Sequence, residues 1–215
     1  MALRCLGNPG RIRVLACLGI LVLTGCQAQT TQTQDVATRV AADGQVPIVR
    51  SLQLVAMTSP MVVEFNVQPP GKSATGTLFL GIRVGDEDAL KSLEAAQALR
   101  RSGLHAELVL KRLEPSGAVN IPLVRVESEA GVPARTIAVS ADGRVPGVWL
   151  DEVDGSSLQS AGLESPERRY TQLAFAWAQG IQPGRYQLRI RLLGQPPQLA
   201  SIESELLVAY RHKSK

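Results

Sequence analysis

From Val49 to the end of the chain, apolar and polar residues alternate with a period of two. Residues 61–67 are apolar at every second position and carry Glu64 and Asn66 between them. Side chains of a strand point alternately to its two faces, so this pattern predicts a strand with one buried face. The same pattern recurs at residues 78–84, 106–113, 121–127, 135–140, 171–178, 185–192 and 202–210. About eight or nine short strands separated by Pro and Gly predict a mainly β fold over residues 48–215, an antiparallel β-sandwich of roughly immunoglobulin-like type.

One segment, residues 86–103, breaks this rhythm and predicts a short helix near residues 87–102. Asp86 is suited to cap the first turn, Arg100 and Arg101 fall in the last turn, and Gly103 follows. These start and stop signals also complement the helix dipole. An apolar stripe at helical spacing is expected to cover one end or face of a sheet. The stripe consists of Leu90, Leu93, Ala96 and Leu99.

The last two predicted strands are expected to form an antiparallel hairpin. In one register Arg189 faces Glu205 and Arg191 faces Glu203, while the alternate positions point into the core. The core positions of the first strand are then Tyr186, Leu188 and Leu192. We favour this ladder of ion pairs over the alternative, a row of arginines that binds an anionic partner.

The first 25 residues have the three parts of a secretory signal. A basic stretch with three arginines precedes an apolar stretch at residues 14–23. As a helix this stretch rises about 15 Å, which is half the thickness of a bilayer core and too short to span it. The signal ends in Leu23-Thr24-Gly25-Cys26, which resembles the lipobox of bacterial lipoproteins. A signal peptide that is cleaved without lipidation is the alternative.

The lipobox resemblance implies that residues 1–25 are removed and that Cys26 carries acyl chains such as palmitate, which form a stable membrane anchor. Gln27, rather than Asp, follows this cysteine. By the sorting rule of such lipoproteins this implies transfer to the outer membrane, with the domain on the periplasmic side. Residues 26–47 are rich in Gln, Thr and Ala, and they are predicted to form a lipidated, flexible tether.

Composition narrows the range of functions. Of the 215 residues, 45% are hydrophobic, which excludes a disordered protein. Three of the 23 basic residues precede Cys26, which leaves 20 against 19 acidic residues, so the charge balance gives no reason to expect nucleic-acid binding. All three cysteines lie at or before Cys26, and the chain has two histidines. Neither a disulfide in the mature domain nor a His/Cys metal site is therefore expected.

Few residues suggest chemistry. The acidic cluster at residues 151–154 could hold Ca²⁺, but its spacing is not that of an EF-hand loop, and we interpret it as a solvated acidic turn. No nucleophile elbow, metalloprotease helix, P-loop or dinucleotide fingerprint occurs in the sequence. We therefore predict no catalytic residue, no metal site and no cofactor. Two residues are candidates for contact with a partner: Trp149, in an expected loop beside Pro146, and Arg185. Trp177 is expected in the core.

The order of these elements resembles a family of bacterial lipoproteins, domain of unknown function 5625. The resemblance lies in the strand at 63–67, the helix at 88–101, the strand IPLVRV at 121–126 and the segment PGRYQLR at 183–189. It implies an envelope lipoprotein and supplies no catalytic residues. Residues 145–168 have no counterpart in this resemblance.

These features predict a membrane-anchored periplasmic lipoprotein that acts as a non-enzymatic protein-binding module. One version is an immunity protein against a toxin that targets the envelope. The alternative is a structural accessory of an outer-membrane or secretion assembly. An envelope hydrolase is less favoured, because no catalytic constellation is recognisable.

Overall fold

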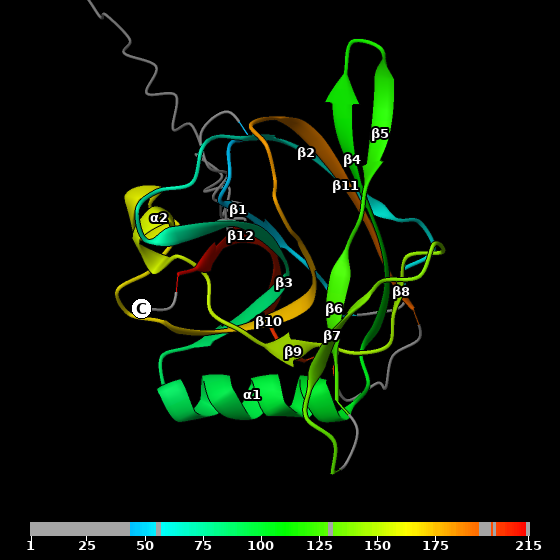
Figure 1. Ribbon diagram of the computed structural model, residues 1–215. Helices are drawn as coiled ribbons and strands as arrows, with labels where there is room; N and C mark the ends of the chain where they lie inside the picture. The colour runs from blue at the N-terminus through cyan, green and yellow to red at the C-terminus, as the bar shows by residue number, and fades with distance from the viewer. Residues whose placement is uncertain (1–43, 55–56, 129–130, 194–198, 200, 214–215) are drawn as a thin grey trace, which may run out of the picture. The chain divides into compact units, whose positions relative to one another are not determined.

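The strands form two antiparallel sheets, which together make the predicted β-sandwich (Figure 1). The computed structural model describes residues 44–54, 57–128, 131–193, 199 and 201–213, so the leader, Cys26 and the tether up to residue 43 lie outside the described residues. The first sheet has seven strands: β1 (Ile48–Ser51), β12 (Ser204–His212), β3 (Ala74–Asp86), β10 (Arg169–Ala178), β6 (Val124–Glu127) and β7 (Arg135–Ala138) in this order, with β9 (Trp149–Leu150) also paired to β10. The second has five: β2 (Met61–Val67), β11 (Gly184–Leu193), β4 (His105–Glu114) and β5 (Gly117–Ile121) in this order, with β8 (Arg144–Val145) also paired to β4.

The core lies between the sheets and follows the predicted alternation. In β2 the apolar residues Val63, Phe65 and Val67 are buried and the polar residues between them are exposed. The ring of Phe65 stacks on Tyr186 of β11, with 6.1 Å between ring centroids. Tyr210 of β12 donates a hydrogen bond to the carbonyl of Gln68 just after β2, which ties the two sheets together.

Most predicted strands occur where the pattern placed them, but the run at 121–127 is two strands in different sheets. β5 ends at Ile121, which pairs with Leu110 of β4, and β6 begins at Val124, which pairs with Trp177 of β10. Pro122 lies between them and cannot donate a backbone hydrogen bond to either sheet. The predicted end of the tether at residue 47 is also too late, because Gln45 bridges to Asn66 and Val46 is buried.

The predicted C-terminal hairpin is wrong. β11 lies between β2 and β4 in the five-stranded sheet, whereas β12 lies between β1 and β3 in the seven-stranded sheet. Arg191 instead pairs with Glu107 of β4, at 2.6 Å, and Glu205 pairs with Arg83 of β3, at 2.7 Å. The alternation itself is confirmed, because the predicted core positions of β11 are buried; these are Tyr186, Leu188 and Leu192. Alternation fixes which face of a strand is buried, but it does not choose the neighbouring strand.

The predicted helix is α1 (Ala89–Arg101), which packs against β3 and β10. Its cap is Asp88 and not the expected Asp86; the Asp88 carboxylate accepts a hydrogen bond from the backbone N–H of Leu90 at 2.8 Å. The prediction of a stripe that is buried throughout is wrong, because Leu90 and Leu93 are 68% and 37% exposed. The buried face consists of Ser92, Ala96 and Leu99. The burial of Ser92 is not evident from the sequence, because a buried hydroxyl needs a hydrogen-bond partner. In the structure this hydroxyl donates to the carbonyl of Val84 at 3.2 Å.

A crossing segment, which we define as residues 149–163, covers the outer face of the seven-stranded sheet. It begins as β9 beside β10, and it reaches the far side of the sheet where Val153 bridges to Arg211 of β12. It then forms α2 (Gly155–Ser160), a short second helix that the sequence pattern did not predict. Leu158 and Leu163 of this segment are buried. The segment shows no periodicity because it is held by single apolar residues rather than by a repeating face.

The exposure of α1 gives a test with a matched control. Leu99→Ala is expected to lower the free energy of unfolding by about 2–5 kcal/mol, because it leaves a cavity in the core. Leu90→Ala, on the exposed side of the same helix, is expected to change it by less than about 0.5 kcal/mol. Urea unfolding of the two variants measures both values. Equal losses would contradict the orientation of the helix.

Candidate binding cleft

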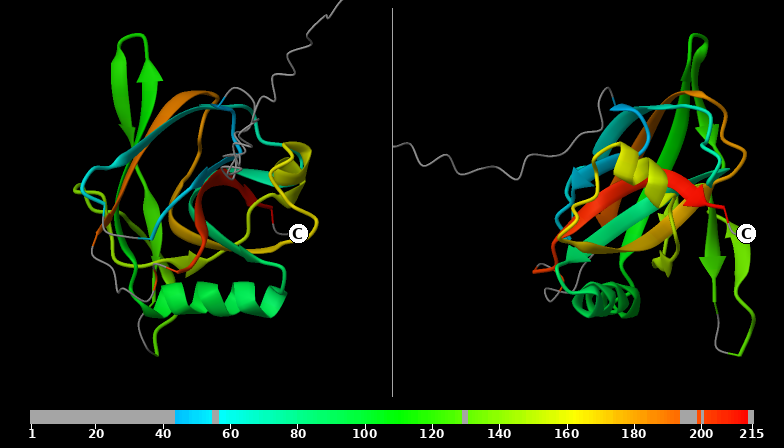
Figure 2. Two further views of the ribbon diagram at one scale, coloured as in Figure 1. Left: turned by 180° about the vertical axis from the view of Figure 1, so that it is seen from behind. Right: turned by 90° about the vertical axis from the view of Figure 1, so that its left-hand side faces the viewer.

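A cleft of about 630 Å³ lies beside the last turns of α1, the helix near the bottom of both views in Figure 2. Its walls are the last turns of α1, strand β6 with Ser128, and residues 145–149, and β10 contributes Ala174 and Phe175. The side chains in it that carry charge or an indole are Arg100, Arg101, Arg125, Glu127 and Trp149.

The end of α1 supplies two of the arginines. Leu99 is completely buried and anchors the last turn, so the next two residues of the helix, Arg100 and Arg101, project outward and are exposed. The guanidinium carbon of Arg100 lies 5.2 Å from the centre of the Trp149 ring, within the range of a cation–π contact. Within the described part of the chain, neither arginine forms an ion pair with a carboxylate.

The third arginine of the cleft shares its charge with an acid. Arg125 of β6 donates to Glu127 at 3.0 Å, and Arg135 of β7 donates to the other oxygen of the same carboxylate at 2.6 Å. Hydrogen bonds from Arg135, and then from Arg125, hold the pKa of the Glu127 carboxyl below its usual value. Glu127 therefore stays ionised at neutral pH but is already engaged by two arginines.

The structure separates the two residues that the sequence offered as partner contacts. Trp149 is half-buried in the cleft, and it lies in a strand rather than in the expected loop, because β9 pairs Trp149 with Ala174 of β10. Arg185 lies in β11 outside the cleft, where its guanidinium is 2.5 Å from Glu64. The hydrogen bond from Arg185, followed by one from Gln187, lowers the pKa of Glu64.

Sequence reasoning missed the arginines of the cleft. The sequence assigns Arg100 and Arg101 to the dipole of the helix, and it indicates no role for Arg125. Their proximity to Trp149 depends on the pairing of β9 with β10, for which two residues give no periodic signal. Of the residues in the cleft, the sequence predicted a partner contact only for Trp149.

The interpretation of residues 151–154 as a solvated turn is wrong. Asp151 accepts a hydrogen bond from the indole N–H of Trp177 at 2.6 Å and pairs with Arg211 at 2.9 Å. Asp154 is buried and accepts a hydrogen bond from Ser156 at 2.7 Å. Burial alone would raise the pKa of Asp154, but hydrogen bonds from neighbouring serines together lower it. Both carboxylates therefore hold the crossing segment in place. Among the residues that the structure describes, no three His, Cys, Asp or Glu side chains are grouped for a metal ion.

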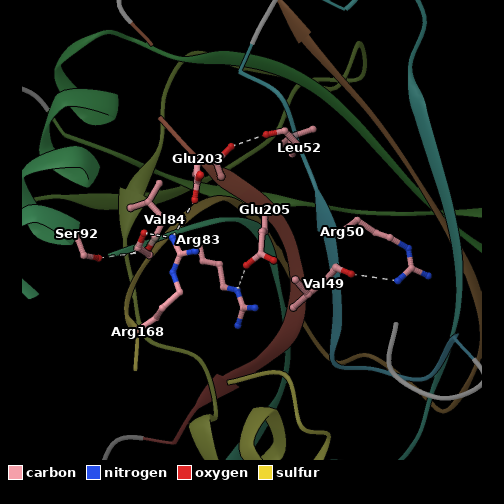
Figure 3. A network of polar contacts seen from close by, with 11 residues as sticks. Val49, Arg50, Leu52, Arg83, Val84, Ser92, Arg168, Glu203 and Glu205 are labelled. Carbon is pink, nitrogen blue, oxygen red and sulfur yellow. Dashed lines mark hydrogen bonds and ion pairs between the residues drawn. The ribbon is translucent and has the colours of Figure 1, made fainter. Parts of the chain in front are cut away.

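A second polar cluster lies on the seven-stranded sheet (Figure 3), and none of its residues lines the cleft. Arg83 of β3 is only 3% exposed, donates from Nε to Glu205 at 2.7 Å, and lies 4.1 Å from the centre of the Tyr170 ring. Arg168 donates to the carbonyl of Gly85 at 2.5 Å and to Glu203 at 3.1 Å. These contacts tie β12 and the start of β10 to β3, so the cluster is structural.

Comparisons with known proteins add little to this description. No protein-family model matches the chain, and no curated protein matches it. Among solved structures, the chain is similar to the crystal structure of a protein from Sulfurospirillum deleyianum, with 10% identity, a TM-score of 0.37, and coverage of 78% of this chain and 98% of that chain. At this level the likeness supports no functional argument. The resemblance to domain of unknown function 5625 therefore stays a prediction. In the described ranges, no helix is long and apolar enough to cross a bilayer.

The two residues of the Arg83–Glu205 pair are expected to differ in how much their replacement lowers the free energy of unfolding. Glu205→Ala leaves the Arg83 charge buried and uncompensated, so we expect a loss of about 3 kcal/mol in the free energy of unfolding. Arg83→Met is expected to lose less than half of this, because Glu205 is 37% exposed and can be solvated. The double variant should resemble Arg83→Met. Urea unfolding measures all three, with Glu64→Ala at the exposed Arg185 pair as a nearly silent control. A double variant that loses the sum of both single losses would contradict the pairing.

Proposed function

We propose that this protein is a bacterial envelope lipoprotein, anchored by acyl chains on Cys26, whose β-sandwich binds another envelope protein and catalyses no reaction. The observation that supports this proposal is the cleft with Trp149, Arg100 and Arg101. Its volume of about 630 Å³ is in the range of ligand sites, and tryptophan and arginine are the residue types most enriched at energetic centres of protein interfaces.

The position of the cleft relative to the start of the domain also supports binding of a protein. Gln45 bridges to Asn66 of β2, beside the first residues of β11. The cleft residue Val145 pairs with Ala106 of β4, beside the last residues of β11. These points are about seven residues apart along β11, or roughly 23 Å. A partner can therefore enter the cleft without contact with the first residues of the domain.

Lipidation is tested at Cys26. Cys26→Ser is expected to abolish incorporation of an alkyne-labelled palmitate and to leave the full-length precursor, because the thiol is the group that is acylated. Metabolic labelling and the electrophoretic size of the chain measure this. A Cys26→Ser chain that is still labelled and shortened would contradict the anchor. Cys17→Ser, within the leader, is the control that should leave both unchanged.

Protein binding at the cleft is tested by cross-linking in cells. A photoreactive residue at Ser128, in the wall of the cleft, is expected to give a discrete cross-linked product with another envelope protein. The same residue at Val119, which is exposed in β5 at the opposite end of the sandwich, should not give this product. Equal products from both positions, or none from Ser128, would contradict the proposal. The identity of the cross-linked protein then distinguishes an immunity protein from an accessory of an assembly.

A further inference from the structure

The charge of the cleft points to an anionic ligand. The described residues that line it include three arginines against one glutamate, and that glutamate is engaged by Arg125 and by Arg135 outside the cleft. Arg100 and Arg101 add two positive charges at the mouth for which the described residues provide no carboxylate. A guanidinium is never deprotonated at physiological pH, so this charge persists.

The end of α1 does not use the donors of these two arginines. Basic residues in a last turn often bind the free carbonyls of the helix. Here the backbone N–H of Ser102 donates to Ala98 O at 2.9 Å, and its hydroxyl donates to Leu99 O at 2.7 Å. The N–H of Gly103 donates to Arg100 O at 3.4 Å. Because the helix is capped in this way, no hydrogen bond from either guanidinium group to the described residues is needed at the end of α1.

The surroundings of Arg100 favour a carboxylate that belongs to an extended chain. The Trp149 ring restrains the guanidinium of Arg100 at one face, while its N–H groups at the edge can still form the paired hydrogen bonds that match a carboxylate. The cleft also has apolar walls, at Val126, Pro146 and Phe175. These walls can accept the aliphatic parts of a chain, and the cleft is larger than a single small anion requires.

We infer that the cleft binds an acidic, extended segment of the partner protein, whose Asp or Glu side chains pair with Arg100 and Arg101. This inference rests on the proposed function, because that function makes another envelope protein the ligand of the cleft. It goes beyond it by naming the chemistry of the segment that is recognised.

The test uses the full acylated chain in detergent and a fluorescein-labelled hexaglutamate peptide, followed by fluorescence anisotropy. Hexaglutamate is expected to bind and hexaglutamine is not. The double variant Arg100→Gln/Arg101→Gln should weaken hexaglutamate binding by roughly tenfold or more, because both ion pairs are lost. The matched control is Arg185→Gln/Arg189→Gln, which removes the same charge from exposed positions of β11 and should change binding by less than about twofold. Equal weakening by both double variants, or no binding of hexaglutamate, would overturn the inference.

Two further probes separate the other sources of negative charge. Inorganic phosphate that displaces hexaglutamate would identify a phosphate site, and phosphatidylglycerol vesicles that bind through Arg100 and Arg101 would identify a membrane contact. Either result overturns the inference. The cross-link from Ser128 reports on the proposed function separately. If hexaglutamate fails while the cross-link persists, only the acidic segment is refuted. If hexaglutamate binds and no cross-link forms, the proposed function is refuted instead.

Discussion

Both faces of β3 are buried from residue 78 to residue 84, so the seven-stranded sheet needs a cover on each side. The five-stranded sheet covers one side and the crossing segment covers the other. Space at the centre is tight: a Cβ atom at Gly81 would lie 2.2 Å from the carbonyl oxygen of Leu173, so only glycine fits where β10 bends over β3. The crossing segment begins as β9 beside β10, and this position places Trp149 next to Arg100 at the end of α1. The cleft thus lies where the cover of the second face of the sheet begins.

The sequence predicts the parts of this structure that depend on a repeating pattern. Strand positions, the buried side of β11 and the existence of α1 follow from alternation or from helix caps, which are local properties. The neighbours of each strand do not follow from them. Their opposite charges predicted that Arg191 and Glu203 pair with each other. In the structure Arg191 pairs with Glu107 and Glu203 pairs with Arg168, and these pairs are equally complementary in charge.

The cleft was less predictable than the fold, for a related reason. It brings together the end of α1, the strand β6 and the short strand β9, which are far apart in the chain. The crossing segment is fixed by isolated contacts such as Asp151 with Trp177, and these leave no period in the sequence. Even Leu93, which belongs to the expected apolar stripe, is partly exposed because the buried face of α1 is centred on Ala96 and Leu99. Helical spacing alone allowed either face to be buried.

The central claim is that the crossing segment, anchored by Leu158, covers the sheet and holds Trp149 beside Arg100. Native-state hydrogen exchange of Leu158→Ala tests it most directly. We expect faster exchange at the backbone N–H of Asp151, which donates to Gln172, and of Asp154, which donates to Tyr210, while amides shared by β4 and β11 keep their protection. If the amides of Asp151 and Asp154 remain as protected as in the unmodified protein, or if protection falls equally in both sheets, the crossing segment is not the separate cover described here.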